Sequence, residues 1–130
     1  MKIGELAERT GCPVETIRYY ERIDLLAPPE RGVNNYRSYG ESHAERLGFI
    51  RHCRALDMSI DEIRTLLGLR ERPEQDCGQV NNLIDGHIAE VRRRIAALTA
   101  LEAQLRDLRS QCGATDAARL CPILNALGSN

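Results

Sequence analysis

The longest hydrophobic pattern in the chain is a seven-residue repeat between positions 77 and 112. The repeat starts at a cysteine, passes through four aliphatic residues and ends at a second cysteine: Cys77, Ile84, Val91, Leu98, Leu105 and Cys112. Such a repeat keeps one face of a helix against a partner helix, so it predicts a long dimerisation helix with a thiol at each end. At a rise of about 1.5 Å per residue the two thiols are roughly 52 Å apart. An antiparallel pair of chains brings Cys77 of one protomer beside Cys112 of the other.

Shorter hydrophobic patterns before this helix predict a compact head. Residues 3–9 have helical spacing and stop at Gly11, a residue type that readily ends helices, and Pro13 opens a second helical stretch over 14–21. Two helices joined by a tight turn form the outline of a helix-turn-helix motif. Turn-forming residues then flank a short β-prone piece at 36–39, which predicts a two-stranded wing.

Two further helices complete the predicted head, one over 41–56 and one that begins after Ser59. Ser59 and Glu62 have the spacing of a capping box, in which each side chain bonds the backbone N–H of the other residue. The predicted fold class is mostly α, with a winged helix-turn-helix head and a long antiparallel coiled-coil helix. The chain is predicted to divide into a winged helix-turn-helix domain at 1–70, a linker at 71–75, the dimerisation helix at 76–112, and a loop with a short terminal helix at 113–130.

Composition narrows the range of functions. Formal net charge is −1, and the charges within residues 1–70 cancel, so a DNA-binding surface must be local. Arginine supplies every basic side chain except Lys2, and its planar guanidinium suits bidentate contacts with phosphates and bases. Aromatic residues are 4% and tryptophan is absent, which predicts an aliphatic core. The N-terminal stretch has no signal-peptide pattern and no segment reads as a membrane span, so we expect a cytoplasmic protein.

An arginine- and tyrosine-rich part of the head is the candidate DNA-binding surface. The second predicted helix and the wing turn polar and aromatic side chains outward, where they can reach base edges or phosphates: Thr16, Arg18, Tyr19, Tyr36, Arg37 and Tyr39. The following helix is expected to offer Arg46, Arg51 and Arg54 to solvent or phosphate. An alternative is a solvated helical hairpin whose arginines balance nearby glutamates, and periodicity alone does not separate the two interpretations.

Three of the five cysteines have the spacing of a metal site: Cys77, Cys112 and Cys121. In a reducing compartment an odd number of cysteines favours metal binding or thiol chemistry over disulfides. Cys77 of one chain with Cys112 and Cys121 of the other would form an all-sulfur site, and a dimer would have two. Thiolates suit soft divalent ions, Pb(II), Cd(II) and Hg(II), with Zn(II) as an alternative if a fourth ligand is present. Cys12 and Cys53 have no such partners and are expected to fill the core of the head.

The remaining polar residues have simpler interpretations. His87 lies inside the predicted dimerisation helix, at the edge of its apolar face, with a secondary metal contact as a minor alternative. His43 and His52 are expected on the surface or near phosphate. No His, Asp or Ser is spaced as a nucleophile and base pair, so the chain is not expected to be an enzyme. A cytosolic thiol-based metal buffer or redox-sensing protein without a DNA role is the rival hypothesis.

Three stretches of the sequence resemble one protein family along nearly the whole chain. They are IGELAERTGCPVETIRYYE, then NNYRSYGESHAERLGFIRHCRALDMSIDEI, and then DCGQVNNLIDGHI, followed by the terminal cysteines. These strings resemble the MerR family of bacterial transcription regulators and are most similar to its lead- and cadmium-responsive branch. Family sensors of monovalent ions carry serine where this chain has Cys77, so the resemblance implies a divalent effector.

The resemblance implies a winged helix-turn-helix head, an antiparallel dimerisation helix and a C-terminal metal-binding loop. By position it assigns DNA contacts to the recognition helix, the wing and a phosphate-contacting helix: Arg18, Tyr19, Tyr36, Arg37 and Arg54, with Arg31 as a weaker candidate. It further implies a homodimer on double-stranded promoter DNA whose two promoter elements are poorly aligned. The effector-bound dimer would bend and untwist the spacer between them so that RNA polymerase engages both, which is work on DNA shape.

Overall fold

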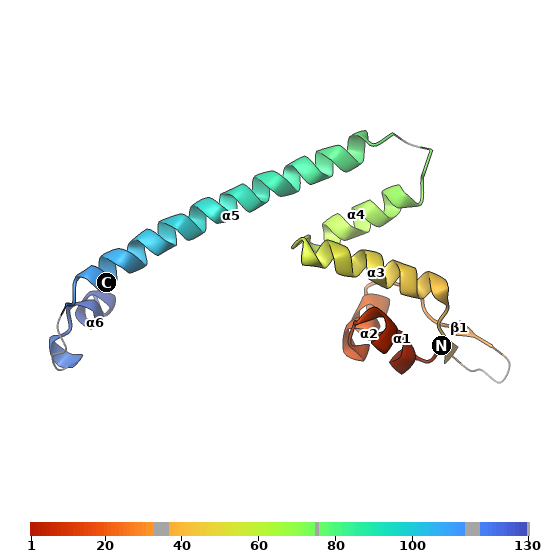
Figure 1. Ribbon diagram of the computed structural model, residues 1–130, viewed down its shortest axis with the longest axis horizontal. Coiled ribbons are helices and arrows are strands. Elements are labelled where there is room, and N and C mark those ends of the chain that lie inside the picture. The colour runs from red at the N-terminus through yellow and green to blue at the C-terminus, as the bar shows by residue number, and fades with distance from the viewer. Residues whose placement is uncertain (33–36, 75, 114–117, 130) are drawn as a thin grey trace. The chain divides into compact units, whose positions relative to one another are not determined.

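The computed structural model describes residues 1–130 except 33–36, 75, 114–117 and 130. It is mostly α-helical and contains two compact units, Met1–Val80 and Asn81–Asn130 (Figure 1). The elements in chain order are α1 (Ile3–Thr10), α2 (Val14–Arg22), β1 (Glu30–Arg31), β2 (Arg37–Ser38), α3 (Glu41–Ala55), α4 (Ile60–Arg70), α5 (Gly78–Ser110), the 3-10 helix η2 (Ala118–Leu120) and α6 (Pro122–Leu127). The predicted mostly α fold class, with a helix-turn-helix head and one long helix, is confirmed. Among the described residues, no helix is both long and apolar enough to cross a membrane.

Helices α1 and α2 form the predicted helix-turn-helix, and the turn between them depends on Gly11. This glycine has a φ of 72°, in the left-handed region that side chains disfavour, and its N–H donates to the Ala7 carbonyl at 2.9 Å. The Arg51 guanidinium donates to the carbonyl of Thr10, the last residue of α1, at 2.8 Å. A Cβ atom at position 11 would overlap Nη1 of Arg51, so a side chain there would strain the backbone and displace this contact. Pro13 is the N-cap of α2 rather than a residue of its first turn.

The wing is a two-stranded antiparallel ribbon formed by β1 and β2. Glu30 pairs with Ser38 and Arg31 pairs with Arg37. The predicted β-prone piece at 36–39 is therefore a strand at Arg37–Ser38, while Tyr36 lies outside the described residues. The wing leads directly into α3, so its position is tied to the helix that carries much of the core of the head.

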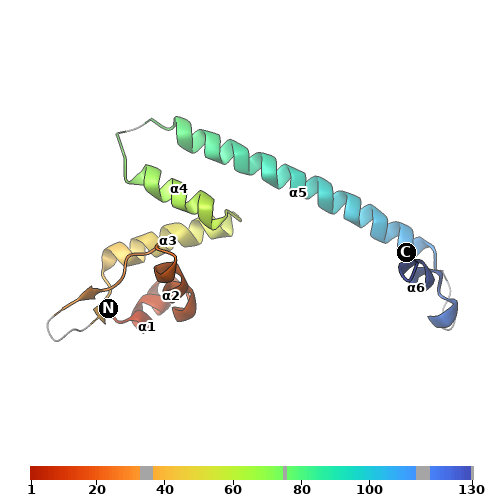
Figure 2. The same ribbon diagram turned by 180° about the vertical axis from the view of Figure 1, so that it is seen from behind.

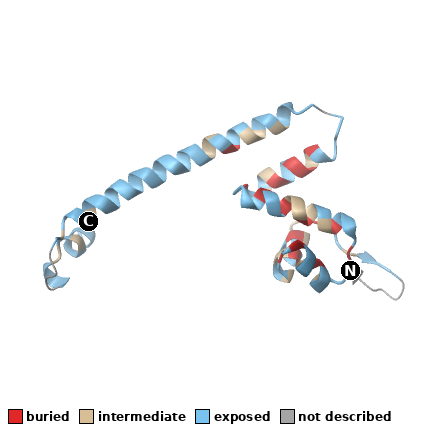
Figure 3. Ribbon diagram, viewed as in Figure 1, coloured by how far each residue is buried: buried red, intermediate tan, exposed pale blue. Residues whose placement is uncertain are grey.

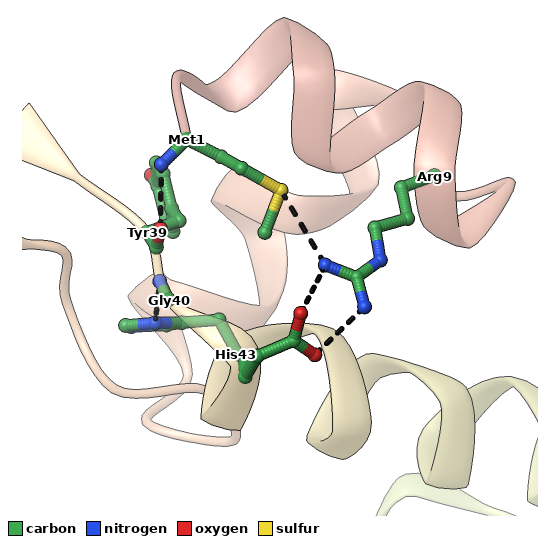
Figure 4. Close-up of polar contacts among 6 residues, drawn as sticks. Met1, Arg9, Tyr39, Gly40 and His43 are labelled. Atoms are coloured by element: carbon green, nitrogen blue, oxygen red, sulfur yellow. Dashed lines mark hydrogen bonds and ion pairs between the residues drawn. The ribbon is translucent and has the colours of Figure 1, made fainter.

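Tyr39 follows β2 and turns into the head rather than outward. Its side chain is only 6% exposed. Its backbone N–H donates to the Met1 carbonyl at 2.8 Å, and the Met1 ammonium donates to the Tyr39 carbonyl at 2.7 Å (Figure 4). The Tyr39 hydroxyl donates to the carboxylate of Glu21 on α2. Tyr39 therefore links the wing to the second helix of the helix-turn-helix.

His43 is buried, and the prediction that it lies on the surface is wrong. The N–H of Gly40 donates to Nδ1 at 3.0 Å, while Nε2 lies 3.2 Å from the carbonyl of Pro28 and donates to it (Figure 4 shows the Gly40 contact). The ring packs edge-on against Tyr39 with 5.1 Å between centroids. Burial is tolerated because both ring nitrogens have partners. His43 lies on the inner face of α3 together with Leu47, four residues later. A search for periodic apolar residues does not find His43, because its side chain is polar.

The head encloses an aliphatic core, as the low aromatic content predicted. Its fully buried side chains come from all four helices of the head and the α2–β1 connection: Leu6, Ile17, Leu25, Leu26, Leu47, Ile50 and Ile63 (Figure 3). The capping box of α4 is confirmed, because Ser59 Oγ accepts the Glu62 N–H at 3.1 Å and the Glu62 carboxylate accepts the Ser59 N–H at 2.9 Å. Cys12 and Cys53 are both buried, as expected of core-filling thiols, and burial raises the pKa of Cys53.

Helix α5 is a single unbroken helix, seen from opposite sides in Figures 1 and 2. It runs from Gly78 to Ser110, so Cys77 lies in the turn just before it rather than in its first turn. The Asp76 carboxylate accepts the Gly78 N–H at 2.8 Å, which satisfies a backbone donor at the start of the helix. Among the described residues after Val80, only His87 is buried. The aliphatic residues along the helix instead face solvent: Ile88, Val91, Ile95, Leu98, Leu101 and Leu105.

Candidate DNA-binding surface and metal site

One hollow on the head has Arg18 of α2 in its lining. Its volume is about 680 Å³, and three basic residues line it: Lys2, Arg18 and Arg22. Arg18 is exposed, as predicted, and forms no ion pair with any described residue. Arg22 packs its guanidinium 5.9 Å from the centroid of the Tyr19 ring. Three cations against the one carboxylate of Glu21 give this hollow a net positive charge on a nearly neutral chain, as a DNA-binding surface requires.

A second hollow brings three of the predicted DNA-contacting residues together. Thr16, Tyr19 and Arg54 line a space of about 340 Å³. Tyr19 is 39% exposed and sets its ring edge-on against Tyr20 at 5.9 Å. The Arg54 guanidinium donates to the Met58 carbonyl at 2.7 Å, which fixes its direction on α3. Both hollows open beside α2, which is the helix that the sequence predicts as the recognition helix.

The wing residues have different positions from one another. Arg31 is exposed on β1. Tyr36 and the side chain of Arg37 lie outside the described residues, so their predicted contacts stay predictions. Tyr39 is buried with its hydroxyl on Glu21, and it also belongs to the lining of the hollow that contains Arg18.

The other two arginines of α3 that were predicted to face solvent or phosphate, like Arg54, bond carbonyls within the head. Arg46 Nε donates to the Leu25 carbonyl at 2.7 Å, and its Nη1 lies 2.9 Å from the Glu71 carboxylate. The Arg51 guanidinium donates to the Thr10 carbonyl at the end of α1. Helical periodicity placed both on the outer face of α3, but it carries no information about carbonyls that other segments bring to that face. Arg22 was overlooked in the sequence, although it follows Arg18 by one helical turn; Lys2 had no comparable signal.

Cys112 and Cys121 lie together in the second unit. They line a hollow of about 390 Å³ between the end of α5 and the start of α6. Cys121 is the N-cap of α6, and Pro122 lies in its first turn, where the missing N–H of proline is tolerated. The N–H of Leu124 is the main cause that lowers the pKa of the Cys121 thiol; the N–H of Ile123 and a hydrogen bond with Cys112 add to this, while burial opposes it. Two thiols in one hollow, one biased toward thiolate, fit a soft metal ion.

Cys77 lies in the first unit, at the start of α5. It is exposed and borders an apolar hollow of about 350 Å³ whose lining includes Phe49, Leu66, Leu69 and Val80. Arg70 stacks its guanidinium 4.9 Å from the Phe49 ring centroid. No group of three His, Cys, Asp or Glu side chains among the described residues of one chain could hold a metal ion. A single chain therefore presents a two-thiol site at one end of α5 and a separate thiol at the other.

The chain is similar to known proteins over most of its length. The family model for MerR HTH family regulatory proteins matches residues 1–69, and the model described as MerR, DNA binding matches residues 44–108. A ZntR homolog of Haemophilus influenzae, an HTH-type transcriptional regulator, is 47% identical over 116 residues, which cover 89% of this chain and 86% of that one. The mercuric resistance operon regulatory protein of Bacillus cereus is 37% identical over 126 residues, covering 97% of this chain and 96% of that one.

Two solved structures share the whole architecture. The transcription regulator PbrR691 from Ralstonia metallidurans CH34, in complex with lead(II), has a TM-score of 0.87 and 53% identity, covering 98% of each chain. The regulator MerR from Bacillus megaterium MB1, in complex with mercury(II), has a TM-score of 0.76 and 35% identity, covering 99% of this chain and all of that one.

A helix-turn-helix head with a cationic surface, joined to a long helix that exposes its apolar residues, defines a DNA-binding transcription regulator. The matched models cover most of the chain, and the relatives are aligned over nearly all of it. The chain belongs to the MerR family of helix-turn-helix regulatory proteins.

Proposed function

We propose that this protein is a metal-responsive transcription regulator that acts on promoter DNA as a dimer. The observation that carries the proposal is the pairing of Cys112 and Cys121 in one hollow, in a chain of a family whose relatives include a lead(II)-bound and a mercury(II)-bound regulator. The effector is Pb(II) or Cd(II), with Hg(II) and Zn(II) as alternatives that the same thiols accommodate. The exact ion depends on the coordination geometry around the thiols.

The DNA-binding domain comprises residues 1–70. Arg18, with Thr16 and Tyr19, enters the major groove from α2 and contacts base edges or phosphates. Residues of the wing and α3 contact the DNA backbone on either side and fix the position of the protein along the duplex: Arg31, Tyr36, Arg37 and Arg54. Tyr39 acts from inside the head. The cations that share a hollow with Arg18 support this assignment, because phosphate contacts dominate the affinity of such interfaces.

The dimer is formed by the segment 76–112, after a linker at 71–75. The exposed aliphatic line of α5 supports an antiparallel pair in which Val91 faces Leu98 of the partner subunit and Ile84 faces Leu105 of the partner subunit. In that pair Cys77 of the partner subunit completes the thiol set of Cys112 and Cys121. Residues 113–130 are the metal-binding loop with its terminal helix, and each dimer has two sites.

Metal binding shifts the equilibrium between two conformations of this dimer. Bending a promoter site costs on the order of 1 to 6 kcal/mol, which protein contacts with the DNA must offset. Closing three thiolates from two chains around one soft ion ties the ends of the two α5 helices together, and this favours the conformation that distorts the spacer. RNA polymerase then engages both promoter elements. DNA affinity need not change, because the switch requires only a difference between the two conformations.

The primary test is transcription in vitro from the cognate promoter with each ion titrated separately. We expect strong activation by Pb(II) or Cd(II), and weaker or no activation by copper(I) or silver(I). The Cys112→Ser and Cys121→Ser variants should bind the promoter as the wild type does and lose activation. Activation only by copper or silver would contradict the divalent thiolate site.

A mixed dimer tests whether the site is shared between chains. Homodimers of Cys77→Ser, and of a Cys112→Ser/Cys121→Ser double variant, should each lack the intact site. A heterodimer of the two variants regains one complete site only if the thiols come from different chains. One equivalent of tightly bound Cd(II) per heterodimer, followed by its thiolate absorbance, is the expected result. A heterodimer that binds no better than either homodimer would contradict the shared site.

The rival hypothesis of a thiol-based metal buffer without a DNA role is not favoured by the family of the chain. Alanine at Arg18 and Arg37 separates it from the regulator. These substitutions should abolish promoter binding and leave metal stoichiometry unchanged. Unaltered transcription in the double variant would contradict the regulator.

A further inference from the structure

Glu21 lies in the hollow that contains Arg18, on a surface where a negative charge opposes DNA phosphates. The two residues are three apart on α2, and side chains at that spacing lie next to each other on a helix. A mobile Glu21 carboxylate would therefore pair with the Arg18 guanidinium and compete with phosphate for it. In the described part of the chain Arg18 has no such pair, because the Glu21 carboxylate accepts a hydrogen bond from the Tyr39 hydroxyl instead.

The Tyr39 ring has a position set by α3 and the wing, not by α2. It is 6% exposed, and His43 packs edge-on against it at 5.1 Å. His43 is itself held through both ring nitrogens, by Gly40 at 3.0 Å and by Pro28 at 3.2 Å. The hydroxyl of Tyr39 is therefore a fixed donor that reaches α2 from a neighbouring element. Fixing a donor in advance reduces the conformational entropy lost when it binds its acceptor.

We propose that Tyr39 is a positioning residue for DNA binding. Its hydroxyl holds the Glu21 carboxylate away from Arg18, so that the Arg18 guanidinium stays open to phosphate or base. This inference rests on the proposed contact between Arg18 and DNA. It assigns a role other than direct DNA contact to the buried tyrosine after β2 and to the acidic residue of the recognition helix.

The test is Tyr39→Phe in the full-length, metal-free dimer, which removes the hydroxyl and keeps the ring. Affinity for a fluorescent promoter duplex is measured by anisotropy over a series of salt concentrations. We expect binding to weaken about 1.4-fold to 2.3-fold for each head, the size expected of competition from one exposed intrahelical ion pair. The dependence of log affinity on log salt should become shallower, because Arg18 then neutralises phosphate for less of the time.

Two further backgrounds separate this role from a general effect on the fold. With Arg18→Ala already present, Tyr39→Phe should cause no additional loss, because the hydroxyl acts through that guanidinium. With Glu21→Gln added, Tyr39→Phe should recover at least wild-type affinity, because the competing charge is gone. An equal loss in the Arg18→Ala background, or no recovery with Glu21→Gln, would overturn the proposal.

Thermal unfolding shows whether the Tyr39→Phe variant folds. If it does not fold, the Glu21→Gln variant alone still tests the proposal. Because it removes only a charge that the wild type holds aside, it should bind at least as tightly as the wild type, and weaker binding would overturn the proposal. An Arg18→Ala variant that binds the duplex as tightly as the wild type would instead overturn the proposed DNA interface on which the inference rests.

Discussion

Apolar residues of the head are buried within one chain, whereas most of those on the long helix are exposed (Figure 3). Leu6, Leu47 and Ile63 of the head are fully buried within one chain, whereas Leu98 of α5 is 64% exposed. Burial removes apolar surface from water at roughly 25 cal/mol per Å², so the head gains this stabilisation alone and α5 gains it only against another helix. The stability of the head should therefore be independent of protein concentration, while every property that needs α5 paired should depend on it.

The largest expected effect comes from a charge in the exposed aliphatic line of α5. Leu98→Glu would bury a carboxylate against the apolar face of the partner helix, and an unpaired buried charge is strongly unfavourable. We expect the dimer to dissociate and promoter affinity to fall at least roughly 100-fold, because the two heads then bind without the gain from linkage. Analytical ultracentrifugation measures the first effect and anisotropy the second.

The matched control is Ala103→Glu, which adds the same charge to an exposed position of α5 five residues later. Position 103 lies on the side of the helix away from the aliphatic line, since five residues rotate a helix by about 140°. This variant should remain a dimer. A Leu98→Glu protein that stays dimeric, or whose head no longer unfolds as a unit, would contradict the contrast between the two regions.

The next effect concerns the head alone. Leu47→Ala removes a fully buried side chain and should lower the free energy of unfolding of the head by about 2 to 5 kcal/mol. Urea unfolding followed by circular dichroism should give the same loss at low and high protein concentration. Leu56→Ala, at a 62% exposed position just after the same helix, should change it by less than about 0.5 kcal/mol. A loss that varies with concentration would show that the core of the head is not independent of the dimer.

A smaller effect is expected from one hydrogen bond of the capping box on α4. Ser59→Ala removes the acceptor of the Glu62 N–H, 3.1 Å away, and should cost about 1 kcal/mol of head stability. Thr65→Ala is the control, because the Thr65 hydroxyl only bonds the Asp61 carbonyl within the exposed face of the same helix. We expect little or no loss there, since alanine favours a helix interior. Equal losses in the two variants would contradict the role of the cap.

Features with a local chemical signal could be predicted from the sequence. Gly11 ends α1, Ser59 caps α4, and a short terminal helix forms within 113–130, at Pro122–Leu127, because each depends on a few neighbouring residues. The long helix was predicted two residues too long at each end, 76–112 against Gly78–Ser110. Helix ends fray within such limits, since the last backbone groups have no intrahelical partners.

Features that depend on distant backbone could not be predicted. His43 is buried because Pro28, fifteen residues earlier, supplies a carbonyl, and periodicity records only that the side chain is polar. Arg46 is held by Leu25 in the same way. In the proposed metal site, the approach of Cys112 and Cys121 follows from their short separation in sequence, whereas the third thiol is proposed to come from a second chain. The DNA surface lies between these cases, because Arg22 follows Arg18 by one turn but Lys2 comes from another segment.

The smallest expected effect is a shift in the pH dependence of Cys121 alkylation. It tests whether the end of the chain keeps its local structure without a partner. The N–H groups of Leu124 and Ile123 lower the pKa of Cys121, and both belong to the same short helix, so the shift should survive in the Leu98→Glu monomer. Since the thiolate is the reactive form, alkylation of Cys121 by iodoacetamide in chelator-treated protein should persist to lower pH than in the urea-unfolded chain. Peptide mass spectrometry assigns the labelled cysteine, and Cys53, whose pKa burial raises, should shift in the opposite direction.

Because the folded pKa of Cys121 lies below its unfolded value, the associated stabilisation is present above the unfolded pKa and disappears as pH falls through the folded one. A midpoint that returns to the unfolded value in the Leu98→Glu monomer would show that α6 needs the partner, and that only the head completes its structure within one chain.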